Sequence, residues 1–67
     1  MAEENLKLDA GEIKVFADRE TEGAWRVEFF DDDGGCYVTV FSGPHAEKRA
    51  RAFGWALAEG TVQPIPN

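Results

Sequence analysis

Apolar and polar residues alternate along three stretches of the chain. Residues 12–17 (EIKVFA) and 24–30 (AWRVEFF) have a period of two, and residues 36–41 (CYVTVF) are dense in β-branched and aromatic side chains. Such patterns are typical of half-buried β-strands. A polar connection over residues 18–23 and an acidic, glycine-containing turn over residues 31–35 separate the stretches. The pattern therefore predicts a three-stranded antiparallel meander.

The periodicity changes after the third stretch. Pro44 has a preset φ that suits the first turn of a helix, and Gly60 is a typical residue to follow the end of a helix. A helix is therefore predicted from about Pro44 to Glu59. Together these elements make an α+β domain of β-β-β-α type, in which the C-terminal helix packs on one face of the sheet.

The domain is expected to occupy residues 11–60 of the 67-residue chain. Residues 1–10 lack periodicity and predict a flexible N-terminal arm. Residues 61–67 form a tail in which Pro64 and Pro66 interrupt both helix and strand.

Alternation also assigns side chains to the two faces of the sheet. One parity is apolar and predicts the core face: Ile13, Val15, Ala17, Trp25, Val27, Phe29, Cys36, Val38 and Val40. On the helix, Ala46, Ala50, Phe53 and Leu57 lie within about 60° of one another. This stripe is expected to cover the core face.

The opposite parity carries aromatic and charged residues that point away from the predicted helix. The candidate binding residues on this second face are Phe16, Arg26, Phe30, Tyr37 and Phe41. The face is either open, covered by the arm or the tail, or buried against a partner. Aromatic residues interleaved with basic ones are also how some sheets stack the bases of single strands.

Trp55 lies off the helix stripe, about 180° from it. Arg51 precedes it by four residues, a spacing that allows a cation-π contact between them. Arg51 and Trp55 are therefore a candidate partner site on the outer face of the helix. Alternatively, the tail folds back and Ile65 packs on Trp55.

Charge is unevenly distributed along the chain. The net charge is −6, and eleven of the thirteen acidic residues precede Gly35. Because such a field repels phosphate groups, binding of duplex DNA is disfavoured.

Three consecutive carboxylates, Asp31, Asp32 and Asp33, follow Glu28 in the second predicted strand. They are predicted to form an acidic partner-binding site. They do not fit a calcium loop that starts at Asp31, because its twelfth position is Ser42, where a bidentate glutamate is needed.

The sequence predicts no catalytic residue, no metal ligand set and no cofactor. Cys36 and His45 are the only thiol and imidazole, and the predicted third strand separates them by roughly 17 Å or more. A Ser-His-Asp set, a phosphate loop and metal-ligand spacing are all missing. With one cysteine, no positive leader and no membrane-spanning run, a cytoplasmic protein without membrane attachment is expected.

These features favour a small, non-catalytic module whose acidic surface binds a protein with a basic surface. The sharpest form of this hypothesis is an inhibitor that mimics the charge of nucleic acid. In size, acidity and lack of catalytic residues the chain resembles small phage-encoded inhibitors such as anti-CRISPR proteins, although the resemblance covers no motif. One alternative is a single-strand nucleic-acid binder that uses the aromatic face, and another is a homodimer that buries it, as a structural or regulatory protein.

Overall fold

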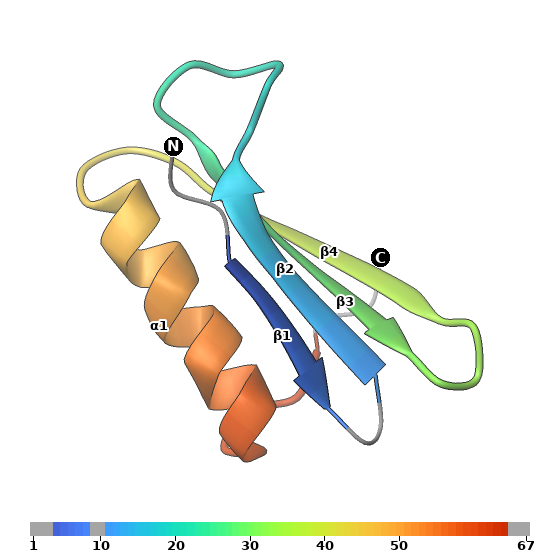
Figure 1. Cartoon of the computed structure of the whole chain (residues 1–67). Coiled ribbons are helices and arrows are strands. Elements are labelled where there is room, and N and C mark those ends of the chain that lie inside the picture. Colours follow the sequence, from blue (N-terminus) through green and yellow to red (C-terminus); the bar gives the residue numbers. More distant parts are fainter. Residues whose placement is uncertain (1–3, 9–10, 65–67) are drawn as a thin grey trace.

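Four antiparallel strands and one helix make up the fold (Figure 1). The structure is a computed structural model that describes residues 4–8 and 11–64. Its elements are β1 (Glu4–Leu8), β2 (Gly11–Ala17), β3 (Trp25–Asp31), β4 (Cys36–Phe41) and α1 (Ala46–Glu59). The strands lie in the order β1-β2-β3-β4, so each pairs with its neighbour in the chain. Helix α1 lies along one face of this sheet (Figure 1).

The predicted meander followed by a C-terminal helix is confirmed in β2, β3, β4 and α1. The predicted flexible arm is wrong over Glu4–Leu8, which forms β1 and pairs with β2, Leu6 opposite Ile13. Asn5-Leu6-Lys7-Leu8 alternates polar and apolar residues, a period-two signal that the predicted arm overlooked, and hydrogen bonding to β2 fixes the strand. Residues 1–3 and 9–10 of the predicted arm lie outside the described residues.

The helix begins two residues later than predicted. His45 is its N-cap residue and has a left-handed backbone with φ 62°. At the other end Gly60 has φ 78°, and its N–H bonds to the carbonyl oxygens of Ala56 and Leu57, which confirms the predicted end of the helix. Residues 61–64 contain no helix or strand, and residues 65–67 of the predicted tail lie outside the described part.

The core lies between β2, β3 and α1. Ile13, Val15, Val27 and Ala50 are at most 1% exposed and form its centre. The predicted helix stripe is confirmed, because Ala46 and Ala50 are buried while Phe53 and Leu57 pack at the margin.

Gly54 marks the closest approach of α1 to the sheet. A Cβ atom at this position would lie 2.8 Å from Cγ2 of Val15, closer than two carbon atoms pack. Small residues at Ala46, Ala50 and Gly54 therefore let the helix backbone lie close to β2.

The predicted facing of β4 is wrong. Tyr37 is opposite Phe29, and the ring of Phe41 lies 5.5 Å from that of Phe53 on the helix. Tyr37, Thr39 and Phe41 therefore lie on the helix side of the sheet. The residues assigned to the core, Cys36, Val38 and Val40, lie on the opposite face, where Cys36 is exposed and Val40 is 50% exposed.

The length of the β3–β4 loop explains this reversal. The Asp31 N–H donates to the Gly35 carbonyl at 3.0 Å, and the Gly34 N–H donates to the Asp31 carbonyl at 3.2 Å. The loop therefore has three residues, 32–34, with Gly34 at φ 91°. With a two-residue loop, odd-numbered residues of β3 are opposite even-numbered residues of β4, whereas with three residues odd is opposite odd. One additional loop residue therefore moves every side chain of β4 to the other face.

Candidate protein-binding surface

The face of the sheet opposite α1 is called the outer face here. Its members, from β2, β3 and β4, are Glu12, Lys14, Phe16, Arg26, Glu28, Phe30, Cys36, Val38 and Val40. Among the described residues, no helix or strand covers it. The strand register arranges these side chains in three rows: Phe16–Arg26–Val40, Lys14–Glu28–Val38 and Glu12–Phe30–Cys36. Charges thus occupy β2 and β3, while β4 contributes only uncharged side chains.

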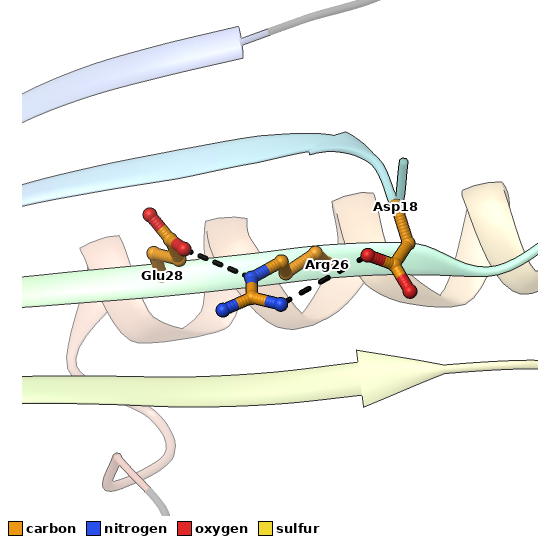
Figure 2. Close-up of polar contacts among 3 residues, drawn as sticks. All are labelled: Asp18, Arg26 and Glu28. Atoms are coloured by element: carbon orange, nitrogen blue, oxygen red, sulfur yellow. Dashed lines mark hydrogen bonds and ion pairs between the residues drawn. The ribbon is translucent and has the colours of Figure 1, made fainter. Parts of the chain in front are cut away.

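An ion-pair network lies on the outer face, toward the β2–β3 connection. The Arg26 Nε donates to Glu28 Oε2 at 2.9 Å, and Arg26 Nη1 lies 3.9 Å from Asp18 Oδ1. Figure 2 shows these three side chains in front of the sheet, with the helix behind it. Lys14 Nζ lies 5.7 Å from the centroid of the Phe30 ring. Arg26 and Lys14, the basic residues that β2 and β3 contribute to this face, thus each already contact a carboxylate or an aromatic ring.

An open hollow of about 320 Å³ lies beside this network. Its lining is mostly charged: Lys14, Phe16, Asp18, Arg19, Glu20, Arg26 and Glu28. Both signs of charge line it, so it suits a polar side chain of a partner better than an apolar group.

The four predicted acidic site residues divide into two pairs. Glu28 is bound to Arg26 on the outer face. Asp31 Oδ1 accepts hydrogen bonds from the N–H groups of Asp33 at 3.1 Å and Gly35 at 2.6 Å, so its carboxylate holds the turn. Asp32 and Asp33 are exposed, and the structure records no ion pair for either within its described part. These two carboxylates remain available to a partner.

Replacing Asp31 with alanine is expected to lower the free energy of unfolding by about 1 to 2 kcal/mol, because two backbone N–H groups lose their acceptor. Urea denaturation measures the change. Asp32→Ala, in the same turn, is the control and should alter the free energy by less than about 0.5 kcal/mol. Equal effects of the two substitutions would show that the Asp31 carboxylate does not hold the turn.

The predicted aromatic site is split between the two faces. Phe16, Phe30 and Arg26 lie on the outer face, as predicted. Tyr37 and Phe41 lie on the helix side, where Tyr37 stacks on Phe29 with ring centroids 5.9 Å apart, so their assignment to the second face was wrong.

Val38, Val40 and Cys36 take the places of these aromatics on the outer face, and the sequence-based assignment missed them. The signal that identifies them is the loop Asp32-Asp33-Gly34. Read as a three-residue hairpin loop with glycine in the left-handed position, it predicts the observed parity.

Trp55 is 50% exposed on the outer side of α1. Arg51, its predicted partner, has its guanidinium 5.6 Å from the ring of Trp25, and Arg51 Nη2 lies 3.0 Å from Glu47 Oε2. The alternative contact of Trp55 with Ile65 lies outside the described residues.

Cys36 begins β4 and His45 lies past the other end of this strand, at the start of α1, so β4 separates the only thiol from the only imidazole. Within residues 4–8 and 11–64, no group of three or more His, Cys, Asp and Glu side chains is placed to hold a metal ion. The single described helix is too short and too polar to span a membrane.

Comparison with known families, with curated proteins and with solved structures finds no match for the chain.

Proposed function

We propose that this protein is a non-catalytic module that binds a protein with a basic surface, and that its acidic turn, residues 31–35, is the centre of the contact. In its sharpest form the module is an inhibitor that occupies the nucleic-acid groove of such a partner. The observation that carries the proposal is that the three carboxylates of the turn differ in their surroundings. Asp31 accepts backbone hydrogen bonds that fix the shape of the turn, whereas Asp32 and Asp33 face solvent.

A turn held in one shape loses little conformational entropy when it binds. Asp31 accepts two backbone hydrogen bonds, so Asp32 and Asp33 are presented from a backbone that is already ordered. Neighbouring carboxylates on an ordered backbone resemble successive phosphates in their charge. The acidic turn is therefore well suited to a groove lined with Arg and Lys.

The outer face adjoins the acidic turn and supplies apolar area. Val40 is 50% exposed, Val38 is partly exposed in the next row, and Phe30 is partly exposed opposite Cys36 at the end nearest the turn. Contacts of this kind add burial to the charge attraction, as at the centre of most protein interfaces. Together, the turn and the outer face fit a partner whose basic groove receives the turn and whose less polar surface beside the groove contacts the outer face.

Two observations favour a protein over single-stranded nucleic acid as the partner. Tyr37 and Phe41 face the helix, which leaves Phe16 and Phe30 as the aromatic residues of the outer face. The guanidinium of Arg26 is bound to Glu28, so a phosphate would have to displace a carboxylate. Both reduce the affinity that base stacking and phosphate contacts can supply.

The proposal predicts that a variant with Asp32→Asn and Asp33→Asn loses its partner while keeping its fold. Immobilised wild-type protein should retain basic, nucleic-acid-binding proteins from an extract of the source cells, and excess nucleic acid should release them. The double variant should retain at least tenfold less, measured by quantitative mass spectrometry. Asp31 is left unchanged in this variant because it holds the turn.

A second double variant controls for net charge. Glu22→Gln and Glu59→Gln remove the same two charges from exposed positions outside the acidic turn, and Glu22 lies near the far end of β3, about 20 Å away along the strand. This variant should retain the same proteins as the wild type. Equal retention by all three proteins would overturn the proposal, as would captured proteins that nucleic acid cannot displace.

A further inference from the structure

Strand β4 is an edge of the sheet, since β3 is its one neighbour in the strand order. In the described part of the chain, no strand pairs with its other side. An edge strand presents a row of backbone N–H and C=O groups to which another strand can add.

The hydrogen bond that closes the β3–β4 loop shows which backbone groups of β4 point outward. The Asp31 N–H bonds to Gly35, so the pairs Phe29–Tyr37 and Val27–Thr39 are also bonded pairs, because bonded pairs alternate in an antiparallel ladder. By the same alternation, the backbone groups of Cys36, Val38 and Val40 point away from β3. Their side chains also lie on the outer face, so this one set of residues offers both hydrogen bonds and apolar contact.

Nothing in the sequence of β4 protects this edge. The strand CYVTVF has no charge and no proline, and natural edge strands are usually protected by charged side chains or proline. The other edge differs, because β1 contains Glu4 and Lys7. Strand β4 is therefore the edge at which another strand is expected to add.

We infer that two copies of this protein pair through β4, antiparallel and about a two-fold axis at Val38, to form one continuous eight-stranded sheet. In this register Val38 is opposite Val38 of the second copy, and Cys36 is opposite its Val40. All three residues with outward backbone groups then form bonded pairs, giving six hydrogen bonds. A shift of two residues in either direction leaves only two such pairs, so the register centred on Val38 satisfies the most groups.

Charge complementarity supports the antiparallel arrangement. The same register places residues 32–34 of one copy beside residues 42–44 of the other. Arg49 lies beside residues 42–44, because its Nη1 is 3.3 Å from the Ser42 carbonyl oxygen and its guanidinium lies over the Phe41 ring. Asp32 and Asp33 of each copy therefore lie near Arg49 of the other copy. The two acidic turns lie at opposite ends of the dimer interface.

The pairing goes beyond the proposed function and does not depend on it. Because Arg49 of a second copy approaches Asp32 and Asp33, the second copy and a basic partner compete for the acidic turn. A single edge strand buries less than the roughly 800 Å² per partner of a standard interface, so the two copies associate reversibly.

Sedimentation equilibrium of the purified protein, without any partner, tests the pairing over a range of concentrations. The wild type should shift from monomer to dimer as its concentration rises. Val38→Lys should remain monomeric at the highest concentration, because two lysines would meet at the two-fold axis. Ala52→Lys adds the same charge at an exposed helix position and should dimerise like the wild type. A wild type that stays monomeric, or a Val38→Lys variant that dimerises equally well, overturns the inference.

Disulfide cross-linking tests the register and does not rely on Val38→Lys folding. In Val40→Cys the new thiol lies about 13 Å from Cys36 of its own chain, too far for a bond within one copy, but opposite Cys36 of the second copy. Oxidised glutathione should convert this variant to a covalent dimer at least tenfold faster than Val62→Cys or the wild type. Equal rates overturn the pairing, and rapid cross-linking of the wild type through Cys36 alone overturns this register.

Discussion

Replacing Val27 with alanine is expected to lower the free energy of unfolding by about 2 to 3 kcal/mol. Val27 is 1% exposed at the centre of the core, between β2 and α1. Removal of two methyl groups loses about 0.8 kcal/mol of burial for each, and the cavity that remains adds to the loss. A domain of this size is held together by only about 3 to 5 kcal/mol. The substitution should therefore remove roughly half or more of the stability, which circular dichroism in urea can measure.

Val40→Ala is the matched control for this prediction. The chemical change is the same and the residue lies on the adjacent strand, but Val40 is 50% exposed. Its loss should stay below about 1 kcal/mol, since little burial is removed and no closed cavity forms. Losses of the same size at both positions would contradict the assignment of the core to the α1 side of the sheet.

Gly54→Leu is expected to lower the free energy of unfolding by about 2 to 3 kcal/mol, although leucine forms helix better than glycine. The intrinsic gain is at most about 1 kcal/mol. Against it, even the first added carbon would lie 2.8 Å from Val15 Cγ2 and 3.7 Å from Ile13 Cγ2. The side chain of Val15 is short and stiff, so the helix must move away from the sheet, which separates Ala50 from the core.

Ala52→Leu on the same helix is the control, because Ala52 is exposed and the substitution adds no contact with the sheet. It should change the free energy of unfolding by less than about 0.5 kcal/mol. The two urea midpoints should therefore differ clearly. If Gly54→Leu unfolds at the same urea concentration as Ala52→Leu, the close approach of α1 to β2 is wrong.

Local periodicity was sufficient to identify three strands and the helix. Alternation over residues 12–17 and 24–30 follows from one face being buried, and it marks β2 and β3 to within about one residue. Gly60 ends α1 because a residue without a side chain adopts the left-handed conformation readily. These features depend on neighbours in the chain, so the amino-acid sequence by itself determined them.

Tertiary structure decided the facing of β4 and the role of Asp31. Both depend on hydrogen bonds that close the β3–β4 loop, and one residue more or less in that loop exchanges the two faces. The short strand β1 is held in place by its antiparallel pairing with β2. For the same reason the candidate surface changed: Val38, Val40 and Cys36 replaced Tyr37 and Phe41, and Asp32 and Asp33 became the available acids. Sequence determined which residues were apolar or acidic, whereas pairing between strands decided which of them lie on the outer face and which on the helix side.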